Sequence, residues 1–175
     1  MNGTNRQREM GNNDSYEYRV SLIIPIYNMA KWLDTCFRSI LNQSIDPQMV
    51  EVLMIDDGSE DNSLDIMKRY SEKYSNFKCY TKENGGPAQA RNFGIKHATG
   101  KYIMYLDPDD YFGRYTIENV SNFFDRHYDE IDVVTYKIIP IKDGEEQDLH
   151  FRYEILQEEG IYDLTEPENS FICLT

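Results

Sequence analysis

Two kinds of segment alternate along the chain: continuous apolar runs, and stretches in which apolar residues recur at helical spacing. Apolar runs that are rich in β-branched residues and end in Pro, Asn, Asp or Gly predict buried strands. The runs are VSLIIPIYN (20–28), VEVLMIDDGS (50–59), FKCYTK (77–82), KYIMYL (101–106) and IDVVTYKIIPIK (131–142), the last turning at KDGEE into an extended acidic region. Helical spacing and helix-start signals predict helices over residues 30–43, 60–74, 87–97 and 116–128.

Residues that favour helix ends mark these segments. Asp61 or Asn62 is a suitable N-cap for the second helix, Pro87 suits the start of the third, and Gly100 is expected to stop it. Strands that alternate with helices predict an α/β fold with a mostly parallel sheet flanked by helices. In such sheets ligands bind beyond the carboxyl ends of the strands. Two acidic clusters, at 56–57 and 107–110, fall at predicted carboxyl ends and form the candidate site.

Composition narrows the function classes. The 175 residues, 40% hydrophobic and 28% charged, predict one globular domain. The net charge of −13 argues against a nucleic-acid partner, and an anionic substrate would need a divalent cation between its phosphates and the acids. Three widely spaced cysteines, Cys36, Cys79 and Cys173, favour reduced thiols in a cytoplasmic protein over disulfides or a zinc site.

The sequence shows no targeting signal that would place the chain in or across a membrane. No apolar run approaches the roughly 20 residues of a membrane span, so we expect no transmembrane segment in this chain. Residues 1–17 lack the apolar core of a signal peptide and are expected to form a disordered arm. The expected location is the cytoplasm, with the inner face of the membrane as the alternative.

The segment LDPDD, from Leu106 to Asp110, has a composition that suits a metal site. Pro108 restricts its own φ and biases Asp107 toward extended backbone, so the carboxylates leave the sheet on a nearly fixed course. Mg²⁺ and Mn²⁺ prefer oxygen ligands and commonly use one or two carboxylates together with substrate phosphates. Taken alone, the same segment also fits a solvated turn, and both interpretations stay open.

Four motifs, taken together and in order, resemble a known family. VSLIIPIYN, VLMIDDGSEDNS, KENGGPAQARNFGI and GKYIMYLDPDD are similar to the nucleotide-sugar-binding half of glycosyltransferase family 2, whose members have the GT-A (Rossmann-like) fold. The resemblance extends from Val20 to Tyr111, and weakly to Ile141. It implies a nucleotide-sugar-binding domain over residues 18–142, followed over 143–175 by the incomplete start of an acceptor-side region.

The resemblance also assigns site residues. The implied nucleotide-sugar-binding set is Pro25, Tyr27, Asp56, Asp57, Asn84, Arg91 and Asp107. Pro25 and Tyr27 would lie beside the base, and Asn84 and Arg91 would line the nucleotide site. Asp107 would point toward the ribose or the sugar.

The acids of the set have separate implied roles. Asp57 would accept a hydrogen bond from the uracil imide, while Asp56 braces the turn. Asp109 would bind Mn²⁺ or Mg²⁺. Alternatives remain for three residues: Arg91 as a structural ion-pair partner of Asp56 or Asp57, Tyr27 as simple edge packing, and Asp110 as a helix cap or an acid behind the metal ligand.

The chain departs from the family in its last part. Family members generally invert the anomeric centre with a carboxylate base in an ED-like motif after LDPDD, and no such motif is evident here. The glutamates available there are Glu158, Glu159, Glu166 and Glu168, which suit surface charge better. We therefore expect the donor-binding part of a longer hexosyltransferase, which binds donor without transferring sugar by itself.

Two function classes fit these motifs. The first is transfer of a sugar from a nucleotide-sugar, expected to be a UDP-sugar, to a glycan, lipid-linked or polymer acceptor in cell-surface polysaccharide or teichoic-acid-type synthesis. The alternative is a noncatalytic nucleotide-sugar-binding or assembly module. A Rossmann dehydrogenase is disfavoured because no GxGxxG follows the first strand. A nucleotidyltransferase is disfavoured because PIYNMAKW stands where its glycine- and lysine-rich loop would be.

Overall fold

The computed structural model describes residues 16–134, 139, 141–142 and 145–146. The chain divides into two compact units, one that ends at Arg126 and one that begins at His127. The predicted N-terminal arm lies outside the described residues except for its last two positions. Residues 147–175, with Cys173 and all four candidate glutamate bases, also lie outside them.

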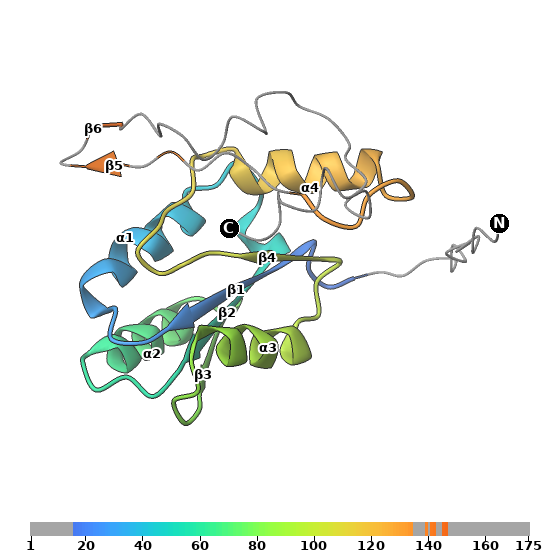
Figure 1. The fold of residues 1–175 in the computed structure, drawn as a ribbon. Helices are drawn as coiled ribbons and strands as arrows, with labels where there is room; N and C mark the ends of the chain where they lie inside the picture. The colour runs from blue at the N-terminus through green and yellow to red at the C-terminus, as the bar shows by residue number, and fades with distance from the viewer. Residues whose placement is uncertain (1–15, 135–138, 140, 143–144, 147–175) are drawn as a thin grey trace, which may run out of the picture. The chain divides into compact units, whose positions relative to one another are not determined.

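The first unit contains a sheet of four parallel strands, as predicted from the apolar runs (Figure 1). The strands are β1 (Val20–Ile26), β2 (Val50–Asp56), β3 (Phe77–Thr81) and β4 (Tyr102–Tyr105), in the order β3-β2-β1-β4. Every residue of β1 and β2 is buried. Both strands are covered on both faces, which explains why their sequences are continuously apolar.

Three α-helices and one short 3₁₀ helix connect these strands, and a fourth α-helix follows β4. They are α1 (Ala30–Leu41), η1 (Pro47–Met49), α2 (Ser63–Lys73), α3 (Pro87–His97) and α4 (Thr116–Arg126). The predicted helices are therefore confirmed, with ends that differ by up to three residues. The expected stop at Gly100 is wrong, because α3 ends at His97 and Ala98 is already extended. Gly100 is needed instead for packing, since an added Cβ would lie 2.6 Å from the Ser21 nitrogen.

The alternation of side chains along each strand separates the two faces of the sheet. On one face, Phe37 of α1 and Tyr70 of α2 pack against Phe77 of β3, with ring centroids 5.8 and 5.9 Å away. On the other face, Ile23 and neighbouring strand residues pack around Ala90 of α3. Helices α1 and α2 thus cover one face and α3 covers the other.

A buried carboxylate ties the amino ends of the strands together. Glu51 of β2 is fully buried and accepts hydrogen bonds from Lys78 Nζ at 2.6 Å, from the Ser21 hydroxyl, and from the N–H and hydroxyl of Thr99 at 2.9 and 3.0 Å. Burial alone would raise the pKa of Glu51, but these donors outweigh it and hold the pKa below its usual value. The contacts fix the α3–β4 connection at the end of the sheet opposite the candidate site.

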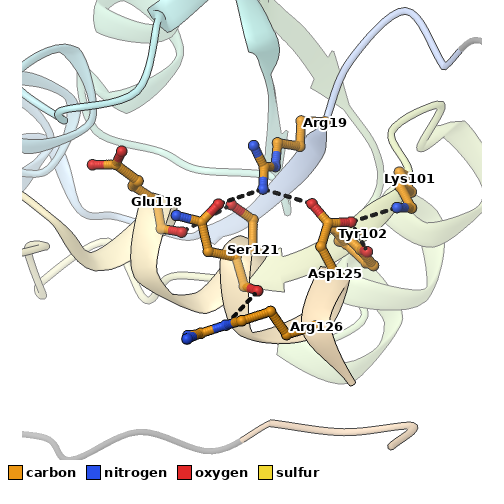
Figure 2. Close-up of polar contacts among 8 residues, drawn as sticks. Arg19, Lys101, Tyr102, Glu118, Ser121, Asp125 and Arg126 are labelled. Atoms are coloured by element: carbon orange, nitrogen blue, oxygen red, sulfur yellow. Dashed lines mark hydrogen bonds and ion pairs between the residues drawn. The ribbon is translucent and has the colours of Figure 1, made fainter. Parts of the chain in front are cut away.

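A second polar network attaches α4 to the same end of the sheet (Figure 2). Asp125 of α4 accepts from Arg19 Nη2 at 2.6 Å and from Lys101 Nζ and the Tyr102 hydroxyl at 2.5 Å. Arg19 also donates to Asn122 Oδ1 at 2.6 Å. Burial would raise the pKa of Asp125, yet its hydrogen bonds with Lys101 and Tyr102 lower it overall. The start of β1 and the start of β4 are therefore held by one helix.

The second unit contains two short strands, β5 (Ile141–Lys142) and β6 (Glu145–Glu146), which pair antiparallel. These strands flank the turn predicted at KDGEE, whose central residues 143–144 lie outside the described part. The predicted fifth strand over residues 131–142 is wrong where the structure describes its beginning, because Ile131–Val134 form no strand. Val133 is 61% exposed, so its apolar side chain is not packed as a buried strand requires. Residues 135–138 and 140 lie outside the described part.

Candidate functional site

The candidate site lies where the four parallel strands end. From β1 the chain adds β2 and then β3 on one side, and β4 returns to pair with the other side of β1. Ligands of open α/β sheets bind at such a reversal, beyond the carboxyl ends of the strands. Strands β1, β2 and β3 end level, because Ile26 pairs with Asp56 and Asp56 with Thr81. Strand β4 ends opposite Ile23, three residues earlier, and the chain continues from there as Leu106 and Asp107.

The loop after β1 is held by the loop after β2. Asn28 adopts a left-handed conformation, with φ of 54°, which Asn tolerates better than most residues. Its Oδ1 accepts from the Glu60 and Asp61 N–H groups at 2.8 and 3.3 Å, and its own N–H donates to the Ser59 hydroxyl at 3.0 Å. Tyr27, one residue earlier, is 44% exposed at the end of β1. The contacts between the two loops thus fix the position of the backbone next to Tyr27.

The start of α2 resolves the choice between the two predicted N-caps. Asn62 occupies the N-cap position, but its side chain makes no capping hydrogen bond. Asp61 supplies the carboxylate instead, accepting from the Ser63 N–H at 2.9 Å and from the Ala30 N–H at 3.0 Å. Asp61 therefore binds the backbone at the start of α1 and at the start of α2. Burial would raise the pKa of Asp61, but its hydrogen bonds with Ser63 and Ala30 lower it overall.

Asp56 ends β2 and is almost fully buried. Its Oδ1 accepts from the Ser59 N–H at 3.1 Å and its Oδ2 from the Thr81 hydroxyl at 2.9 Å. The side chain thereby closes the turn at Gly58, whose φ of 78° and close approach to Asn84 require glycine. Both Asp56 oxygens are used within the protein, so this residue shapes the loop that carries its neighbour.

Asp57 lies between the end of β2 and the start of α3, and its side chain is only 4% exposed. It accepts from the ammonium of Lys82, from the Gly85 N–H at 3.0 Å and from the Gly86 N–H at 2.7 Å. Gly86 is the N-cap of α3 with φ of 87°, a backbone conformation that favours glycine. A negative charge at a helix N-terminus is also favourable. Asp57 therefore anchors the glycine turn and presents a carboxylate at the strand ends.

Arg91 and Asp107 form an ion pair across the site. Arg91 Nη2 of α3 lies 2.5 Å from Asp107 Oδ1, immediately after β4, and both side chains are partly exposed. The alternative in which Arg91 pairs with Asp56 or Asp57 is wrong, because Arg91 pairs with Asp107, while the Asp56 and Asp57 carboxylates accept from other donors. Asn84 is exposed in the loop between β3 and α3. Pro25 is buried within β1, whereas Tyr27, two residues later, is exposed.

The LDPDD segment forms a tight turn beyond β4. The Asp110 N–H donates to the Asp107 carbonyl at 3.0 Å, Pro108 is buried, and the three carboxylates are exposed. Partial burial and then repulsion from Asp109 and Asp107 raise the pKa of Asp110. Burial raises the pKa of the Cys36 thiol to about 12, and the negative charges of the same three acids contribute to this shift. The carboxylates are close enough to repel one another.

Asp110 does not cap the following helix, which corrects one of its two proposed roles. Helix α4 begins only at Thr116, and its first turn is bound by Gln43, whose Oε1 accepts from the Ile117 N–H at 3.0 Å. Gln43 also donates to the Gly113 carbonyl at 2.8 Å. This buried glutamine, which the sequence analysis missed, therefore holds the loop that follows the acidic turn.

The acidic turn fits a divalent ion only with help from a substrate. Among the described residues, no three or more His, Cys, Asp or Glu side chains are grouped so that they could hold a metal by themselves. The available donors are exposed carboxylate oxygens, which suit Mg²⁺ or Mn²⁺, and their mutual repulsion would be relieved by a cation. Asp109 and Asp110 are the carboxylates of this turn for which no contact to Arg91 is seen, and a diphosphate would supply the remaining oxygens.

Lys82 is the other site residue that the sequence analysis missed. Its ammonium contacts the buried Asp57, but a lysine after a strand is most often on the surface, so only its place in the motif KENGG could have suggested a role.

No helix in the described part of the chain is long and apolar enough to cross a membrane.

Comparison with known proteins assigns the family. The model of the glycosyl transferase family 2 matches residues 21–175. The minor teichoic acid biosynthesis protein GgaB of Bacillus subtilis is 45% identical over 128 residues, which are 73% of this chain and 14% of that protein. The chain thus spans about one seventh of that relative.

Solved structures agree with this assignment. S. aureus TarS 1–349 in complex with UDP-GlcNAc has a TM-score of 0.59 and 33% identity, over 63% of this chain and 32% of that one. The mannosyltransferase PcManGT of Pyrobaculum calidifontis, in complex with GDP-Man and Mn²⁺, has a TM-score of 0.55 and 27% identity, over 63% and 33%. The chain belongs to glycosyltransferase family 2, and its sheet and helices have the arrangement of a GT-A fold.

Proposed function

We propose that this chain is the donor-binding part of an inverting hexosyltransferase that takes a sugar from a UDP-sugar. The acceptor we propose is a cell-surface polysaccharide or teichoic-acid-type polymer, which the similarity to GgaB supports. The proposed compartment is the cytoplasm, supported by the free thiols of Cys36 and Cys79. The observation that carries the proposal is the convergence of Asp57, the Arg91–Asp107 pair and Asp109 at the topological switch point.

In this proposal each residue has a separate task. Asp57 accepts the N3–H of uracil, and Tyr27 packs beside the base. Arg91 and Asp107 line the passage from the base to the sugar, and their ion pair keeps both side chains in position. Asp109 holds Mn²⁺ or Mg²⁺ together with the diphosphate. When bound, the ion would stabilise the departing nucleoside diphosphate as a Lewis acid.

The base preference provides the test. Uracil offers a donor at N3, whereas cytosine offers only an acceptor there, and a buried carboxylate rejects a ligand that cannot satisfy it. Calorimetric titration of the chain in Mn²⁺ with UDP, CDP, GDP and ADP should rank UDP tightest, by about tenfold or more over CDP. GDP is included because the similar PcManGT binds GDP-Man. Tightest binding of any other diphosphate, or binding of none, would refute the UDP-sugar proposal.

A further inference from the structure

Lys82 has a mostly buried side chain, although lysine side chains are rarely buried. It follows β3 directly, where its backbone N–H donates to the Asp56 carbonyl at 3.0 Å. The side chain is 16% exposed, and its ammonium donates to Asp57 Oδ1 and, at 2.5 Å, to the Glu83 carbonyl. Taking an ammonium out of water is unfavourable unless such contacts offset it, so the placement is a specific one.

The contacts of Asp57 show what this ammonium controls. A carboxylate has about four lone-pair positions for hydrogen bonds. Lys82 donates to Oδ1, the Gly86 N–H donates to Oδ2, and the single Gly85 N–H is shared between Oδ1 at 3.0 Å and Oδ2 at 3.2 Å. Three donors of the protein therefore leave about one acceptor position on Asp57. The two backbone donors are fixed by the glycine turn, so Lys82 is the one side chain among the three.

We propose that Lys82 is a positioning residue that sets the base selectivity of the donor site by acting through Asp57. The inference rests on the proposed function, in which Asp57 accepts from the nucleotide base. With the ammonium in place, the carboxylate is held at both oxygens and offers only an acceptor to the ligand. A base with a donor at that position is accepted, and a base with an acceptor there is rejected.

Loss of the Lys82 ammonium would remove one of the three donors that hold the Asp57 carboxylate. Asp57 Oδ1 would keep only the Gly85 N–H, and the carboxyl group would be free to tilt on its remaining contacts. The preference between the two pyrimidines would then fall while the rest of the nucleotide site remained intact.

The experiment measures affinities for UDP and CDP, in Mn²⁺, with the wild-type chain and with Lys82→Met, Lys82→Gln and Lys82→Arg. We expect Lys82→Met and Lys82→Gln to lower the UDP/CDP affinity ratio by about tenfold. Lys82→Arg should restore most of the ratio, because its guanidinium can still donate to Asp57. Lys96→Met, an exposed lysine on α3, is the matched control and should leave the ratio unchanged. Circular dichroism checks that each variant is folded.

Each outcome decides one question. If the wild type prefers UDP and folded Lys82→Met or Lys82→Gln keeps that preference, the role of Lys82 is refuted while the proposed function stands. If a folded Lys82 variant binds neither nucleotide, Lys82 contributes to binding itself rather than to selectivity, and the inference also fails. If the wild type does not distinguish UDP from CDP, the proposed function fails first.

Discussion

Asp109→Asn should lower the affinity of the chain for UDP in Mn²⁺ to nearly the affinity measured in EDTA. The substitution keeps the size of the side chain and removes the charge that would hold the ion against the diphosphate. Replacing even an indirect partner of a metal commonly lowers metal affinity by about 10- to 100-fold, so loss of a ligand should cost at least that much. Calorimetric titration with UDP, in Mn²⁺ and then in EDTA, measures the metal-dependent part directly.

Asp110→Asn is the matched control, because it makes the same chemical change one residue away in the same exposed turn. It should retain most of the metal-dependent affinity, since Asp110 is the acid that the proposal leaves without a direct contact to the ion. A larger loss for Asp110→Asn than for Asp109→Asn would reassign the metal ligand. Equal and small losses for both would remove the acidic turn from the site.

Glu51→Gln should lower the free energy of unfolding by about 2–3 kcal/mol at pH 7 without touching the candidate site. The glutamine amide can accept with only one of its two terminal groups, and its NH₂ would face the donors Ser21, Lys78 and Thr99. Urea denaturation followed by circular dichroism gives the difference. Glu72→Gln, on the exposed surface of α2, is the control and should change stability by less than about 0.5 kcal/mol.

The same variant should also change the response to acid. The folded pKa of Glu51 is lowered, so its ionised form contributes stability at pH values above the unfolded-state pKa of about 4.3. That contribution is lost as the pH falls through the lower, folded pKa. The stability difference between wild type and Glu51→Gln should therefore shrink below about pH 4. A difference that stayed constant from pH 7 to pH 3 would contradict the network described for Glu51.

The strands and helices of the first unit could be predicted because their signals are local. The apolar runs of β1 and β2 record burial on both faces, and Pro87 marks the start of α3. The run that begins at Ile131 has a similar apolar pattern, but the pattern does not show whether a partner strand is available. The strand predicted there is wrong for this reason. Gly100 shows the same limit, since its sequence context resembles a helix stop while its actual constraint is the nearby backbone of Ser21.

The location of the candidate site could also be predicted, but its pairings could not. The rule that ligands bind beyond strand ends places Asp57 and Asp107 at one edge from the sequence alone. Which acid Arg91 contacts depends on the rotation of α3 about its axis, and that rotation is fixed by the packing of Gly94 against Ile23. The role of Lys82 depends on a contact across 25 residues that no local pattern records.

The central claim is that the strand-end site binds a uridine diphosphate compound through a divalent ion between its carboxylates and the diphosphate. The most direct measurement is the affinity of the wild-type chain for UDP, determined by calorimetry in Mn²⁺ and again after the metal is removed with EDTA. We predict one binding site in Mn²⁺ and an affinity at least about tenfold lower in EDTA. Equal affinity under both conditions would contradict the claim.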